Sequence, residues 1–143
     1  MAKILLVDDD RDLTHSLSQI LRIKGYEVVV AYSGTEGLKK LLETKPDLVL
    51  MDVMMETDTA GFEAIYKIRS DRPDSKFKDF KDIPIIILTA IDQVTNSTFS
   101  LDQEESFLPG RNEFLNKPVD PDELLEKIEK NLKISKMRKL FWK

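Results

Sequence analysis

Several apolar stretches of this 143-residue chain end in residues that could do chemistry. Asp8 and Asp9 follow an apolar run near the N-terminus, and Asp52 ends a second run of the same design. Thr89 ends a third run, and Lys117 follows a short fourth one. Carboxylates suit a hard cation such as Mg²⁺, whereas a hydroxyl and an ammonium group can hold the oxygens of an anion. If these residues converge, they form a pocket for a cation beside a negatively charged group.

The elements that would position these residues alternate along the chain. Runs of Ile, Leu and Val predict buried strands at residues 3–7, 26–32, 47–52, 83–88 and 113–116. Apolar residues at helical spacing predict helices at 12–24, 34–45, 61–70 and from 120 onward, with one irregular helix within 92–111. Residues 71–82 are polar and predict an enlarged surface loop. This order predicts a doubly wound α/β domain with a five-stranded parallel sheet and its site at the carboxyl ends of the strands.

Together, these strand-end residues and their spacing resemble the receiver domain of bacterial response regulators, over roughly residues 2–132. The resemblance implies a flavodoxin-like (βα)5 fold. It also implies that Asp52 accepts a phosphoryl group in a Mg²⁺-dependent reaction and that Asp8 and Asp9 hold the metal. Thr89 and Lys117 would contact the phosphoryl oxygens.

Simple electrostatics supports a metal at this place. Three carboxylates within a few ångströms of one another repel, and a divalent cation among them removes the conflict. Mg²⁺ keeps several waters, so Asp8, Asp9 and Asp52 together with one main-chain carbonyl would be enough protein ligands. We expect that carbonyl to be the one of Met54.

The resemblance further implies a switch between two states. Thr89 would move toward the phosphoryl group, and Phe114 would turn inward to fill the space that Thr89 leaves. Phe114 could instead be an ordinary core residue, since it lacks the hydroxyl that would make an outward position favourable. The bond between Lys117 and Pro118 is expected to be cis, as in the family.

The expected function is that of a phosphorylation-activated switch, with no enzymatic activity beyond its own phosphorylation and dephosphorylation. The phosphoryl donor would be a sensor histidine kinase or a histidine phosphotransfer protein, and the output would pass to a protein partner that the sequence does not identify. Two alternatives remain. A small aspartate-nucleophile phosphatase would usually have a second Asp where this chain has Met54. A receiver-like interaction module that is never phosphorylated would usually have lost an acid, the threonine or the lysine.

The composition narrows the function classes. The net charge is −4 with 34% charged residues, so no broad basic surface exists for direct nucleic-acid binding. The chain has no cysteine, which excludes disulfides and thiolate metal sites and fits a cytoplasmic protein. The apolar run at the N-terminus is too short for a signal peptide or a membrane span, and we expect no membrane contact.

The C-terminal residues differ from the rest. Residues 133–143 place Ile134, Met137, Leu140 and Phe141 at helical spacing among basic residues, and the last helix is expected to reach about residue 140. We therefore divide the chain into a receiver domain, 1–132, and a basic amphipathic helical extension, 133–143. The extension could dock a partner, form a dimer, lead into an effector or lie along its own domain. A monomer or a weak dimer is expected.

Overall fold

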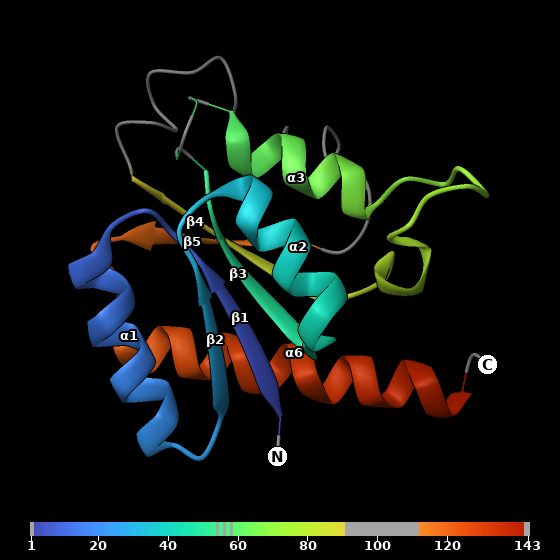
Figure 1. The fold of residues 1–143 in the computed structure, drawn as a ribbon. Helices are drawn as coiled ribbons and strands as arrows, with labels where there is room; N and C mark the ends of the chain where they lie inside the picture. Colours follow the sequence, from blue (N-terminus) through green and yellow to red (C-terminus); the bar gives the residue numbers. More distant parts are fainter. Residues whose placement is uncertain (1, 54, 56, 58, 91–111, 142–143) are drawn as a thin grey trace.

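The fold is built around one parallel sheet, as the sequence predicts. The computed structural model describes residues 2–53, 55, 57, 59–90 and 112–141 (Figure 1). The strands are β1 (Lys3–Val7), β2 (Glu27–Ala31), β3 (Leu48–Asp52), β4 (Ile85–Ala90) and β5 (Asn112–Lys117). Their order across the sheet is β2-β1-β3-β4-β5, and every neighbouring pair is parallel. The helix expected within 92–111 lies outside the described residues.

Helices cover both faces of this sheet (Figure 1). They are α1 (Arg11–Ile23), α2 (Gly34–Thr44), α3 (Ala60–Ile68) and α6 (Pro121–Phe141), with a short 3₁₀ helix, η1 (Lys78–Phe80). Leu41 of α2 and Ile65 of α3 pack on one face, against side chains such as Val7 and Met51. Leu17 and Leu21 of α1, with Leu124 and Ile128 of α6, pack on the other face. The sheet is therefore doubly wound, and its strands are apolar on both sides because both sides are covered.

Local signals in the sequence set the ends of the helices. The Asp10 side chain accepts a hydrogen bond from the Leu13 amide at 3.1 Å, so α1 begins at Arg11, one residue earlier than expected. Ser33 caps α2 in the same way through the Glu36 amide. After α1, Gly25 has a φ of 94°, a value at which a residue with a side chain is strained. The Lys117–Pro118 bond is cis, which confirms the prediction.

The segment 71–82 is more than the surface loop that its polar sequence predicts. It contains η1, and the Phe77 side chain is 5% exposed and belongs to the core on the side of α2 and α3. Arg69, which is also buried, donates hydrogen bonds to the Lys81 carbonyl at 2.6 Å and to Asn112 Oδ1 at 3.0 Å. Arg69 thus links the segment to the end of α3 and to the start of β5. The buried Phe77 ring anchors the segment in the core, although its neighbours in the sequence are polar.

Gly61 allows α3 to approach the end of β3. Its amide donates a hydrogen bond to the Val53 carbonyl at 2.9 Å. A Cβ atom at this position would overlap the Asp52 carbonyl oxygen and lie 2.8 Å from Val53 Cα. Only glycine therefore fits between the first turn of α3 and the backbone that carries Asp52.

We expect Gly61→Ala to lower the free energy of unfolding by about 2–4 kcal/mol, because backbone atoms cannot move aside as a side chain can. Gly37→Ala is the matched comparison, since its added Cβ would lie 2.9 Å from a methyl group of Val7, which is a side chain. Urea unfolding followed by circular dichroism measures both. Equal stability losses in the two variants would show that the close approach at Gly61 is not a strict constraint.

Candidate functional site

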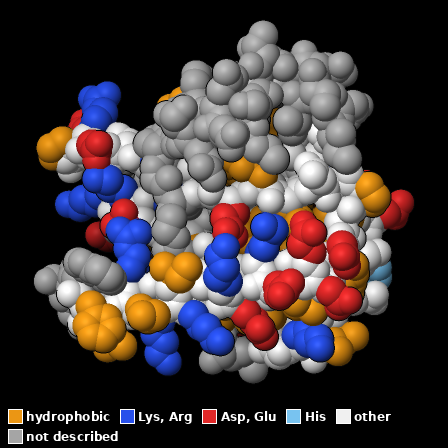
Figure 2. Space-filling model, turned by 180° about the vertical axis from the view of Figure 1, so that it is seen from behind, with side chains coloured by type: hydrophobic (Ala, Val, Ile, Leu, Met, Phe, Trp, Pro, Cys, Tyr) orange, Lys and Arg blue, Asp and Glu red, His pale blue; other side chains and the backbone are white. Residues whose placement is uncertain are grey.

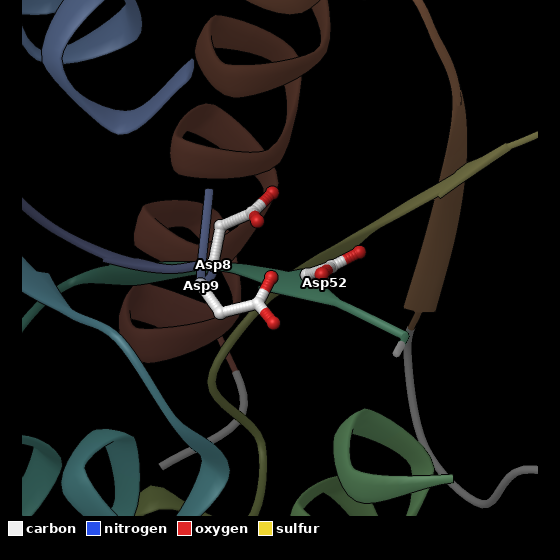
Figure 3. A group of neighbouring side chains, drawn as sticks. All are labelled: Asp8, Asp9 and Asp52. Carbon is white, nitrogen blue, oxygen red and sulfur yellow. The ribbon is translucent and has the colours of Figure 1, made fainter. Parts of the chain in front are cut away.

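The register of the sheet brings Asp8 and Asp52 together. Val7 of β1 pairs with Met51 of β3, so the next residue of each strand lies at the same edge of the sheet. One carboxylate oxygen from each of Asp8, Asp9 and Asp52 lies within 4.8 Å of the others, and Figure 3 shows the three side chains grouped at the ends of the two strands. The convergence that the sequence predicts is therefore present.

The three consecutive acids after β1 have separate tasks. The Asp8 side chain is fully buried and its Oδ1 accepts a hydrogen bond from the Asp10 amide at 3.0 Å. Asp9 is exposed and turns toward Asp52, as Figure 3 shows. Asp10 caps α1. Of the three acids, only Asp10 therefore serves as the start of a helix.

Lys117 is the cation of the site. Its Nζ donates a hydrogen bond to Asp52 Oδ1 at 3.0 Å and lies 3.0 Å from Asp8 Oδ2. The contact with Asp8 has the distance of an ion pair, and Asp8 Oδ2 is buried and has no other partner. The lysine reaches this position from β5, whose last residue pairs with Ala90 at the end of β4.

The crowding changes the acidity of Asp52. Burial and the neighbouring Asp8 charge raise the pKa of Asp52 from 3.8 to about 6, although Lys117 acts in the opposite direction. Burial lowers the pKa of Lys117, but its contacts with Asp8 and Asp52 outweigh this effect and the pKa is raised overall. Lys117 therefore keeps its positive charge, and a neutral Asp52 is favoured below about pH 6 when no other cation is present.

The residues fit a divalent metal ion. Three carboxylates and one ammonium group leave a formal charge of −2 in the site, which one divalent cation would balance. Asp8 Oδ2, a buried acceptor with no hydrogen bond, is the kind of atom that a metal ion satisfies. The donor set is oxygen only, as Mg²⁺ prefers. Met54, whose carbonyl is the expected fourth protein ligand, lies outside the described residues.

Thr89 and Phe114 lie on the same face of the sheet. Ile87 pairs with Phe114, and Thr89 is two residues beyond Ile87, so its side chain is directed to the same face. Thr89 is 2% exposed, and its hydroxyl donates a long hydrogen bond of 3.4 Å to the Ala90 carbonyl. Phe114 is half-buried against the core on the side of α2 and α3. Phe114 is therefore a partly exposed residue at the edge of this core.

One polar group near the start of β5 is not predicted from the sequence. Glu113 accepts hydrogen bonds from Lys130 Nζ and from Asn131 Nδ2, both at 2.6 Å, and it connects β5 to α6. Burial alone would raise the pKa of Glu113, but these partners lower it overall. Asn131 is 4% exposed and also donates to the Lys127 carbonyl. The sequence signal for this buried polar contact is Asn131 itself, a polar residue three positions after Ile128 on the inward face of α6.

Comparisons with known proteins agree on one family. The family model named response regulator receiver domain matches residues 4–129 of this chain. Protein PilH of Pseudomonas aeruginosa is 35% identical over 90% of this chain and 95% of its own length. Response regulator MprA of Mycobacterium ulcerans is 34% identical over 94% of this chain, which spans only 52% of that relative. The CheY-like receiver domain structure from Methanospirillum hungatei superposes with a TM-score of 0.74 at 33% identity, over 96% of this chain and 98% of that one.

We expect Asp52→Asn to stabilise the metal-free protein. Between 3.8 and about 6 the folded protein holds a proton on Asp52 that the unfolded chain has released, so wild-type stability falls as pH rises through this interval. The variant has no carboxyl group at position 52 and so avoids this loss. The difference in free energy of unfolding between the variant and wild type should grow from near zero below about pH 4 to about 1–3 kcal/mol above about pH 7.

Urea unfolding in EDTA over this pH range measures the effect, and Asp74→Asn, at an exposed residue away from the site, is the control. Mg²⁺ should stabilise the wild type more than the Asp52→Asn variant. An advantage of Asp52→Asn that does not change with pH would contradict the assignment.

Proposed function

This chain belongs to the family of response regulator receiver domains, and on that premise we propose that Asp52 is its phosphoacceptor. Phosphorylation-dependent signalling by two-component systems is the role of this family. The observation that supports Asp52 is its position: it ends the central strand β3, Lys117 donates a hydrogen bond to its carboxylate, and Asp8 and Asp9 lie beside it.

The proposed reaction moves one phosphoryl group. A carboxylate oxygen of Asp52 forms a bond to phosphorus while the bond from phosphorus to the donor breaks, and the donor leaves with that electron pair. Asp8, Asp9 and Asp52, with the Met54 carbonyl, would hold Mg²⁺, which neutralises charge on the phosphoryl oxygens. Lys117 supplies a second positive charge, and its two acidic neighbours keep it protonated. The Thr89 hydroxyl donates to a phosphoryl oxygen. The protein thus contributes positioning and charge.

The proposed partners follow from this chemistry. The donor is the phosphohistidine of a sensor histidine kinase or of a histidine phosphotransfer protein, and the output is a change in binding to a protein partner. The cytoplasm is the proposed location, and a monomer or a weak dimer is the proposed state. Since the family is a signalling family, we do not adopt the alternative of an aspartate-nucleophile phosphatase.

The proposed switch couples Thr89 to Phe114. When Thr89 moves toward the phosphoryl group, space opens on the face that Phe114 shares with it, and burial of the half-exposed ring becomes favourable. The adjacent Glu113 is tied to α6 through Lys130 and Asn131, so a change in β5 would also reach α6. The surface read by a partner would then include the exposed side of β5 and α6.

The phosphoacceptor assignment is tested by intact mass measurement after incubation with Mg²⁺ and acetyl phosphate. We expect wild type to gain the mass of one phosphoryl group and Asp52→Asn to gain none, because the nucleophilic oxygen pair is lost. Lys117→Met should reduce the rate by at least about tenfold, since one charge that stabilises the transferred group is missing. A phosphoryl adduct on Asp52→Asn would remove Asp52 from this role.

The switch is tested separately with Thr89→Ala. We expect this variant to accept the phosphoryl group but to lose the change at Phe114 that accompanies phosphorylation in the wild type. Amide hydrogen exchange of β5 with and without the phosphoryl group measures this change, and Thr44→Ala, at a threonine of α2 remote from the site, is the control. If phosphorylation alters β5 equally in wild type and Thr89→Ala, the threonine is not the coupling residue.

A further inference from the structure

The C-terminal end of the sequence has a charge unlike that of the remaining chain. Residues 133–143, here called the C-terminal segment, contain no acid. Their basic residues are Lys133, Lys136, Arg138, Lys139 and Lys143. The whole chain nevertheless has a net charge of −4, so positive charge is concentrated at one end of one helix. Such a concentration suits a negatively charged surface.

The apolar side chains of this segment do not continue the core face of α6. Leu124, Ile128 and Asn131 define the buried face. At 3.6 residues per turn, Met137 and Leu140 lie about 150° around the helix from that face. Met137 is 52% exposed and Leu140 is 68% exposed, which agrees with this geometry. The side chains of Met137 and Leu140 are therefore not part of the core of the domain.

Figure 2 shows the consequence on the surface. Hydrophobic side chains lie next to Lys and Arg side chains at the end of the molecule where α6 ends, and acidic side chains gather over the start of α6. The exposed acids of that first part are Asp122, Glu123, Glu126 and Glu129. Within α6, it is therefore the C-terminal segment that combines exposed apolar side chains with an excess of positive charge.

We propose that the C-terminal segment binds the surface of an anionic phospholipid bilayer. Its apolar side chains would enter the headgroup region, and its basic side chains would lie against the lipid phosphates. The acids at the start of α6 would be repelled, so α6 would meet the bilayer tilted, with its C-terminal end inward. A second copy packed through the same segment would instead bring two basic clusters together.

This mode of binding does not need a spanning helix. Among the described residues, no helix is long and apolar enough to cross a membrane. The expectation of no membrane contact was based on the lack of a spanning segment in the sequence. A short amphipathic helix can bind at the membrane surface without spanning it. The proposal does not depend on phosphorylation of Asp52, so the two can fail independently.

The chain offers its own reporter for the test. Its only tryptophan, Trp142, is in the C-terminal segment. With the full chain, we expect Trp emission to shift to the blue on addition of vesicles made of phosphatidylglycerol and phosphatidylcholine. Vesicles of phosphatidylcholine alone should cause little shift, and salt should reverse binding. Co-sedimentation gives the affinity.

A charge variant with a matched control makes the test specific. Lys136→Gln, Arg138→Gln and Lys139→Gln together should weaken binding by about a hundredfold, at about fivefold per removed charge. The control replaces exposed Lys24, Lys39 and Lys67 by Gln, which gives the same net charge, and it should bind nearly as well as wild type. Met137→Ser with Leu140→Ser should weaken binding and reduce the blue shift while the basic residues remain.

Three outcomes would overturn the proposal, provided that circular dichroism shows all variants folded. The first is no spectral shift with anionic vesicles. The second is an equal loss of binding in the control, which would reduce the effect to net charge. The third is a blue shift with soluble polyglutamate as large as that with vesicles, which would point to an acidic protein surface as the partner.

Discussion

The mutual repulsion of carboxylates at the ends of β1 and β3 is the constraint on which the site depends. Asp8 is fully buried, Asp52 is 3% exposed, and a carboxylate oxygen of each lies within 4.8 Å of the other and of Asp9. Charges in such a position are tolerated only when cations stand beside them. Lys117 supplies one positive charge, and the remaining negative charge suits a divalent metal ion.

β5 connects this pocket to the rest of the molecule. Lys117 at its end contacts Asp52 and Asp8. Phe114 is directed to the face covered by α2 and α3, while Glu113, the preceding residue, bonds to Lys130 and Asn131 of α6 on the other face. A small displacement of one strand would therefore be felt on both faces of the sheet, since packed elements move as units rather than deform continuously.

The sequence predicts those parts of the fold and the site that depend on local pattern. Apolar runs that end in Asp8, Asp52 and Thr89 can be recognised in the sequence. Their convergence can be predicted as well, because parallel strands bring their carboxyl ends to one edge of the sheet. The role of Gly61 is not visible, since it depends on how closely α3 approaches β3. The polar neighbours of Phe77 predict a surface loop. Its position in the core cannot be predicted in this way, because it depends on tertiary packing.

The same repulsion that makes the pocket costly can also drive the switch. A phosphoryl group on Asp52 would replace a carboxylate of charge −1 by a group of nearly −2, so the demand for nearby donors would increase. Lys117 already donates a hydrogen bond to Asp52, so the added negative charge calls for a further donor. Thr89 is the next donor along the edge of the sheet, and its present hydrogen bond to the Ala90 carbonyl is long, at 3.4 Å. A hydrogen bond from the Thr89 hydroxyl to a charged oxygen would be stronger than this long one, and the volume that Thr89 leaves would lie on the face of Phe114.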